Sequence, residues 1–285
     1  MRALAEYAMR DRRSAALVAL LLGMVPLVSW LSASVVALVV LKRGAAEGFL
    51  VALWALIPAA YLWYLGDGVA LPLIVVVFVS SLVLRSTVSL VNAMIAQQVL
   101  AAIVALVVVK LNLAPFATLL DIMKQMAEKI DLAKQFDLPV IEAQQYELLV
   151  ANFYSFSLAS TAILALLVAR WWQSMLYNPG GFRQEFHQLK LPAAVAAVLV
   201  LAVVTAGAES PIAPVIMLLT VPITVVGIAL VHGLVKMLGM SKRSLAAFYV
   251  ATFVLGPYIY LPLVIAVLAD SFFDFRNRFR KDSQS

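Results

Sequence analysis

The chain has 285 residues, of which 64% are hydrophobic and 13% are charged, with a formal net charge of +6 and no cysteine. Soluble domains carry roughly 25% charged residues, so this composition excludes an ordinary soluble protein, and the lack of cysteine excludes disulfides and cysteine-ligated metals. The basic charge does not indicate nucleic-acid binding, because the cations stand at the ends of apolar segments and form no aromatic-studded basic face.

The apolar segments predict an all-α fold, a polytopic transmembrane helix bundle that forms a single domain over residues 1–285. Runs of about 17–25 apolar residues are long enough to cross ~30 Å of hydrocarbon. The first run follows a polar, basic start at residues 1–13 and continues past Ser32-Ala33-Ser34 to Leu41. We expect it to be a retained signal anchor of a multi-pass protein in the bacterial inner membrane, in contact with the lipid bilayer.

Six segments have the length and composition of full crossings. They are residues 48–64, 71–84, 87–109, 150–176, 191–205 and 212–238. Two further apolar stretches, residues 14–41 and 245–269, are longer than one crossing requires. Each is broken near its middle, the first by Gly23-Met24-Val25-Pro26 and the second by Gly256-Pro257.

The positions of Lys and Arg distinguish two topologies. If both broken stretches are helical hairpins that turn back at their breaks, 17 of the 21 Lys and Arg residues face the cytoplasm. Only Lys110, Lys124, Lys129 and Lys134 then lie outside. Cytoplasmic loops are enriched in these residues, so the pattern favours six spans flanked by two hairpins, 8–10 segments in all, with both termini in the cytoplasm. Eight plain spans are the alternative.

The one sizeable polar stretch covers residues 112–148 and lies on the extracytoplasmic side in the favoured topology. Its apolar residues recur at helical spacing: Phe116, Leu119, Leu120, Met123, Met126, Ala127 and Ile130. This spacing predicts an amphipathic helix. Such a helix either rests in the membrane interface or forms a lid over the mouth of a cavity.

Polar residues inside the predicted spans are candidates for function, because each needs a partner in a medium without water. The candidate substrate-binding residues are Gln97, Gln98, Asn152, Tyr154, Ser157 and Thr161. They either line a pocket for a small solute or act as interhelical contacts, which are worth only ~0.6 kcal/mol each.

The most distinctive stretch runs from Arg170-Trp171-Trp172-Gln173 to Tyr177-Asn178-Pro179-Gly180-Gly181-Phe182 and then Phe186. Paired tryptophans anchor a helix end in the headgroups, and Asn-Pro-Gly-Gly predicts a tight turn. The stretch is therefore either an anchored cytoplasmic loop or a docking surface for a partner protein, with Trp171, Trp172, Phe182 and Phe186 as candidate docking residues.

No pattern of catalytic or metal-binding residues is present. The sequence has no phosphate-binding G-x-x-x-x-G-K-[ST] loop, and its two histidines, His187 and His232, stand far apart. Asp270 and Asp274 fall at or beyond the end of the last apolar stretch, and Asp67 belongs to a Gly-Asp-Gly turn. We therefore expect no enzyme activity, no catalytic residue, no metal and no cofactor.

Three stretches together resemble the YybS-like family of bacterial membrane proteins. They are the Arg170-Trp-Trp-Gln…Asn178-Pro-Gly-Gly-Phe182 stretch, the Pro26 break that leads to Leu41-Lys42-Arg43-Gly44…Gly48, and the closing Asp270-Ser-Phe-Phe-Asp-Phe-Arg276. That family is remotely similar to the substrate-capturing S-components of energy-coupling-factor transporters and to the rod-shape protein MreD. The resemblance implies a substrate-binding or scaffolding membrane subunit.

We therefore expect a membrane subunit resembling a transporter S-component, which binds a small solute in the outer half of the bundle. The alternative is a cell-envelope scaffold or assembly factor that acts through contacts with a membrane or cytoplasmic protein partner. An intramembrane enzyme or lipid-handling protein is a third class, which would require ionisable residues clustered around one deep cavity.

Overall fold

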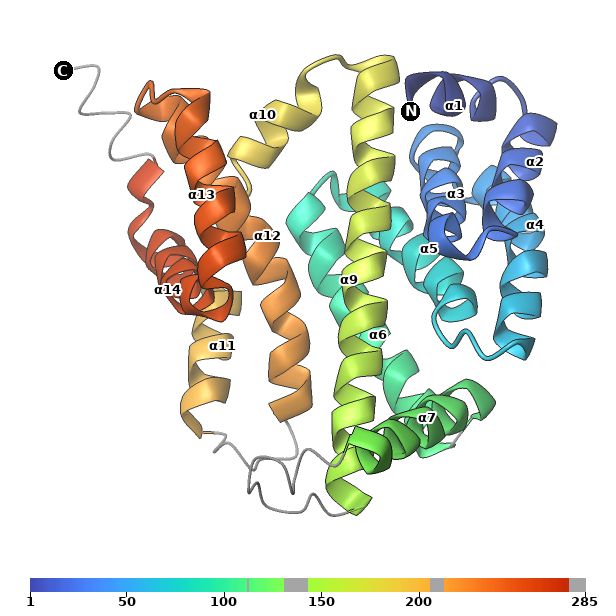
Figure 1. Ribbon diagram of the computed structural model, residues 1–285. Coiled ribbons are helices and arrows are strands. Elements are labelled where there is room, and N and C mark those ends of the chain that lie inside the picture. Colours follow the sequence, from blue (N-terminus) through green and yellow to red (C-terminus); the bar gives the residue numbers. More distant parts are fainter. Residues whose placement is uncertain (112, 131–142, 206–212, 277–285) are drawn as a thin grey trace. The chain divides into compact units, whose positions relative to one another are not determined.

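The computed structural model describes residues 1–111, 113–130, 143–205 and 213–276, and these fall into two compact units, Met1–Tyr177 and Asn178–Ser285. Within the described ranges every regular element is helical and no strand occurs, so the predicted all-α fold is confirmed. Figure 1 follows these helices along the chain. The prediction of one membrane domain stays a prediction.

The described residues of unit 1 form nine helical elements. They are α1 (Arg2–Ala8), α2 (Arg12–Gly23), the 3-10 helix η1 (Pro26–Val28), α3 (Trp30–Arg43), α4 (Ala45–Tyr64), α5 (Ala70–Thr87), α6 (Leu90–Lys110), α7 (Ala114–Ile130) and α9 (Ala143–Tyr177). Unit 2 holds five. They are α10 (Gly181–His187), α11 (Ala193–Thr205), α12 (Ala213–Met237), α13 (Lys242–Leu255) and α14 (Pro257–Phe273).

Five helices in unit 1 are long and apolar enough to cross a membrane, which identifies a multi-pass membrane protein. They are Pro26–Arg43, α4, α5, α6 and Val150–Tyr177. Four of the six predicted full crossings coincide with these helices, and the other two are not confirmed. The 13 residues of α11 span only about 20 Å. In α12 the described apolar part, Val221–Met237, belongs to the shorter class of apolar helices.

The chain reverses direction at the Pro26 break, and α2 packs side by side with α3. Proline has no N–H to donate, so an α-helix that continued through this position would lose a backbone hydrogen bond. Two hydrogen bonds join the chain before the turn to the chain after it. The Ser32 hydroxyl donates to the Ala19 carbonyl at 2.7 Å, and the Arg43 guanidinium donates to the Met9 carbonyl at 2.5 Å.

Helix α3 is the buried centre of unit 1. Every residue from Leu31 to Leu41 is buried, and the helix packs against α2, α4, α5 and α9. Gly48 on α4 lies against Val40, so closely that any side chain there would overlap it. A glycine at this position therefore lets α4 approach α3.

The carboxyl end of α3 is closed by side chains from two other helices. Arg85, near the end of α5, donates to the Leu41 carbonyl at 2.7 Å and to the Val40 carbonyl at 3.1 Å. Gln173 on α9 donates to the Leu41 carbonyl at 3.4 Å, and Arg170 donates to the Gln173 amide oxygen at 2.6 Å. Terminal helix carbonyls have no partner within their own helix, so these contacts satisfy them. The carboxyl ends of α3, α5 and α9 therefore meet at one end of unit 1.

In unit 2 the chain turns sharply at Gly256, between α13 and α14. This residue has φ +49° and ψ −119°, a conformation that glycine adopts at little cost. Before the turn, the Tyr249 hydroxyl on α13 lies 2.8 Å from His232 Nε2 on α12. After it, the Arg276 side chain lies beside Gly233, the next residue of α12. Both arms therefore return to the same end of α12.

We predict that Arg85→Gln destabilises the protein by about 1 kcal/mol, because two terminal carbonyls of α3 lose a charged donor. Thermal unfolding in detergent measures this loss. Arg2→Gln is the matched control, since the exposed Arg2–Glu6 pair, 2.7 Å apart, contributes little. Equal unfolding temperatures for the two variants would contradict the capping role of Arg85.

Candidate functional site

Helix α7 covers one end of unit 1. It is the end opposite to the one where the carboxyl ends of α3, α5 and α9 meet, beside Arg85. Its residues Phe116 and Leu120 are buried in one cluster with Ala105 and Val108 of α6 and Val150 and Tyr154 of α9. In the same place the Tyr154 hydroxyl donates to the Gly68 carbonyl, in the turn between α4 and α5, at 2.7 Å. The predicted amphipathic helix is therefore packed on the bundle by the first half of its apolar stripe.

The second half of that stripe is more exposed. Met123 and Met126 are 39% and 51% exposed. Residues 131–142 of the predicted extracytoplasmic segment lie outside the described residues.

The shared cluster sets the register between α6 and α9. The two helices are antiparallel, because α6 starts just after Arg85 and α9 ends beside the same α3 carbonyls. Seven residues along a helix is about two turns and returns nearly to the same face. Gln98 comes seven residues before Ala105 on α6. Thr161 comes seven residues after Tyr154 on α9, which runs in the opposite direction.

A second pair of cluster residues indicates the same register between α6 and α9. Eleven residues is about three turns, and this step leads from Val108 to Gln97 on α6 and from Val150 to Thr161 on α9. These helical steps put both glutamines at about the level of Thr161, on the sides of α6 and α9 that carry the cluster residues.

The two glutamines are fully buried, at 0% and 1% exposure. Neither the oxygen nor the nitrogen of either side-chain amide has a hydrogen-bond partner among the described residues. Buried polar groups are nearly always hydrogen-bonded. Mutational data on proteins put the free-energy cost of burying an amide without a partner at about 1–3 kcal/mol. Four unpaired amide atoms at one level of a membrane bundle mark a position that requires a polar partner.

The other candidate residues of α9 divide into two groups. Ser157 follows Val150 by seven residues, so it lies on the same face as Thr161, one turn nearer to α7. Tyr154 is on this face too, but its hydroxyl is already bonded to Gly68. Asn152 precedes Tyr154 by two residues and points about 200° away. By this register Gln97, Gln98, Ser157 and Thr161 share one side of the α6–α9 pair, and Asn152 lies on another. The Asn152 side-chain oxygen is also buried without a partner among the described residues.

In the described ranges, two further buried hydroxyls have no hydrogen-bond partner, and neither was among the predicted residues. They are Ser160 on α9, beside Thr161, and Ser34 on α3. Serine is common in membrane helices, and many of its hydroxyls bond to their own backbone, as Ser80 does to the Val76 carbonyl at 2.8 Å. Sequence alone carries no signal that separates the unpaired serines from the paired ones.

The four candidate docking residues differ in exposure. Trp172 is 0% exposed, which does not favour a docking role for its side chain. Trp171 is 39% exposed. In unit 2, Phe182 and Phe186 are half-buried and lie against each other, with ring centroids 5.7 Å apart.

Comparisons with protein-family models, with curated proteins and with solved structures give no match. The assignment of function therefore rests on the residues themselves. Among the described residues, no three His, Asp or Glu side chains gather where they could hold a metal ion.

We predict that Tyr154→Phe lowers the unfolding free energy by about 1 kcal/mol and leaves solute binding unchanged, because the hydroxyl anchors the α4–α5 turn. Thermal unfolding with and without solute separates the two effects. The control is Tyr61→Phe, whose side chain is 63% exposed. If Tyr154→Phe abolished binding at unchanged stability, the hydroxyl would belong to the solute site after all.

Proposed function

We propose that this protein binds a small polar solute between α6 and α9, at the level of Gln97, Gln98 and Thr161, as a subunit resembling a transporter S-component. The observation that carries the proposal is the buried pair of glutamine amides without partners. In hydrocarbon no water is at hand to satisfy such groups, so a bound polar molecule is the natural partner.

The chemistry of the lining residues indicates an uncharged solute. A glutamine amide offers both a donor and an acceptor, and serine and threonine hydroxyls do the same. Between Leu90 and Val109 α6 carries no Asp, Glu, Lys or Arg, and neither does α9 from Leu148 to Ala169. An ionic solute would be unpaired there, at a cost of several kcal/mol. A neutral molecule rich in amide or hydroxyl groups fits the site.

Helix α7 supplies the second element of the proposal. It packs over the end of the bundle through Phe116 and Leu120, about 10 Å along α9 from Thr161. We propose that α7 is a lid, which shields the bound solute from water. Its exposed residues Met123 and Met126 would face the membrane interface.

The charges at the two ends of unit 1 support a proposed orientation. Arg12, Lys42, Arg43, Arg85 and Arg170 gather at the end away from α7. By the positive-inside bias, that end faces the cytoplasm of a bacterial inner membrane, and α7 lies on the outer side. The α2–α3 pair is then a hairpin that enters and leaves on the cytoplasmic side, and the α13–α14 pair is its counterpart near the carboxyl end.

The resemblance to the YybS-like family and to S-components agrees with a binding role rather than a catalytic one. The chain has no ATPase motif. Active transport would therefore need a partner that supplies energy, or an ion gradient.

We predict that Gln97→Leu and Gln98→Leu, singly and together, abolish stabilisation by the solute while leaving the ligand-free protein as stable as wild type or more stable. Leucine removes the unpaired amide atoms and keeps a buried side chain of similar size. The solute is first identified by a thermal-shift screen of neutral vitamins, nucleobases and sugars against the protein in detergent. Full saturation, at a hundredfold excess over Kd, stabilises the wild type by about 2.7 kcal/mol.

Ser80→Ala is the control for these variants, because the Ser80 hydroxyl is already bonded within α5. It should keep the response to solute. If the leucine variants instead destabilise the ligand-free protein, the glutamines serve as interhelical contacts and the proposed site is wrong.

A further inference from the structure

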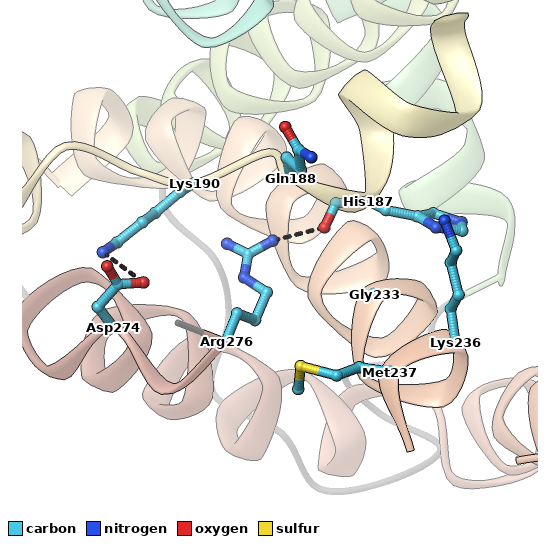
Figure 2. Close-up of a pocket in the computed structure, with 8 residues that line it drawn as sticks. All are labelled: His187, Gln188, Lys190, Gly233, Lys236, Met237, Asp274 and Arg276. Carbon is cyan, nitrogen blue, oxygen red and sulfur yellow. Dashed lines mark hydrogen bonds and ion pairs between the residues drawn. The ribbon is translucent and has the colours of Figure 1, made fainter. Parts of the chain in front are cut away.

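A cavity of about 490 Å³ lies within unit 2, and all of its lining residues belong to that unit. Three segments form it: the end of α10 with the residues after it, the carboxyl end of α12, and the end of α14 with the residues after it. Figure 2 shows its lining residues, which are His187, Gln188, Lys190, Gly233, Lys236, Met237, Asp274 and Arg276. Its size falls within the range of about 300–1,000 Å³ typical of small-molecule sites.

The wall of the cavity is built around Arg276. Its guanidinium donates to the His187 carbonyl at 2.9 Å and the Leu189 carbonyl at 2.8 Å, and it pairs with the Asp270 carboxylate at 2.7 Å. Asp270 is only 2% exposed, so this pair is a fixed part of the fold. Asp274, at φ +51°, ends α14 and turns the chain so that Arg276 reaches back to Asp270.

Gly233 lets α12 approach this wall. A Cβ at this position would lie 2.7 Å from the His187 carbonyl oxygen, which is too close for any other residue without a shift of the backbone. The close approach brings the next turn of α12, with Lys236, to the same cavity as His187.

The cavity carries an excess of positive charge. Lys190, Lys236 and Arg276 are cationic, and Asp274 is the one acidic residue of the lining. Lys190 pairs with Asp274 at 3.1 Å and Arg276 with Asp270, whereas Lys236 forms no ion pair with any described residue. The His187 Nδ1 atom is also buried, and it has no hydrogen-bond partner among the described residues.

The charge also acts on His187. Burial lowers the pKa of this imidazole below its ordinary value, and the charges of Lys236, Arg183 and His232 lower it further. The positive charges near His187, and not its burial, are what would favour an anion in the cavity.

We propose that this cavity binds the phosphoryl group of a phosphate ester. A phosphoryl group presents three acceptor oxygens and up to two negative charges, and the lining offers the Lys236 ammonium, the Lys190 ammonium and the Gln188 amide as donors, with the unpaired imidazole of His187. The proposal does not depend on the solute site in unit 1.

Two sources could supply such a group. The cavity lies at the ends of the apolar helices α12 and α14, where the headgroup of an anionic phospholipid would reach it, and a soluble phosphate ester would offer the same chemistry. The experiment therefore has two arms, and both use the full chain.

In the first arm, thermal shift in detergent measures binding of inorganic phosphate and glycerol phosphate, with sodium chloride at matched ionic strength as reference. In the second, native mass spectrometry counts phosphatidylglycerol retained by the protein, against phosphatidylcholine. We expect binding in at least one arm, weakened about tenfold or more by Lys236→Gln, the loss typical of one charged hydrogen bond.

Lys110→Gln is the matched control, because it removes one exposed lysine from unit 1 and should leave binding unchanged. A response confined to the first arm identifies a soluble ester, and one confined to the second identifies a lipid headgroup. No binding in either arm, or binding that Lys236→Gln leaves unchanged, would overturn the proposal.

Discussion

The interior of a membrane offers no water, so each polar group within it must find its partner in the protein. In this chain the helix ends meet that requirement through side chains from elsewhere in the sequence. Arg85 and Gln173 bond to the carboxyl end of α3, and Arg276 bonds to the carbonyls of His187 and Leu189. The amides of Gln97 and Gln98 have no such partner in the part of the chain that the structure describes, and the proposed function rests on them.

The same requirement gives the cations a second role. The sequence places them at helix ends, which is enough to suggest an orientation through the positive-inside bias. It does not indicate that Arg85 and Arg43 also bond to the carbonyls of Leu41 and Met9, because each acceptor lies more than 30 residues away along the chain. The Arg-Trp-Trp-Gln stretch is similar. Its Arg170 donates to Gln173, which donates to the Leu41 carbonyl at the end of α3, and its Trp172 is buried.

Local features of the sequence were sufficient for most of the helices. Long apolar runs predicted α4, α5, α6 and α9, and Pro26 and Gly256 marked the reversals, because proline cannot donate a hydrogen bond and glycine tolerates positive φ. Sequence reasoning predicts which polar residues are candidates for the site, but it does not predict how they are arranged in space. Which of them face one another depends on the register of α6 against α9, which the packing of α7 reveals. The proximity of His187 and His232, whose ring centroids are 6.1 Å apart, likewise depends on tertiary packing.

The central claim is that the space between α6 and α9 at Gln98 admits a polar molecule, and cysteine accessibility tests it directly because the natural chain has no cysteine. The measurement is the rate at which a small water-soluble thiol reagent modifies Gln98→Cys in membranes, relative to Val99→Cys, which is 53% exposed on the outer surface of α6. The account predicts that the buried Gln98→Cys reacts, that solute slows the reaction, and that Val99→Cys reacts only with a lipid-soluble reagent. A Gln98→Cys protein that no water-soluble reagent modifies would contradict it.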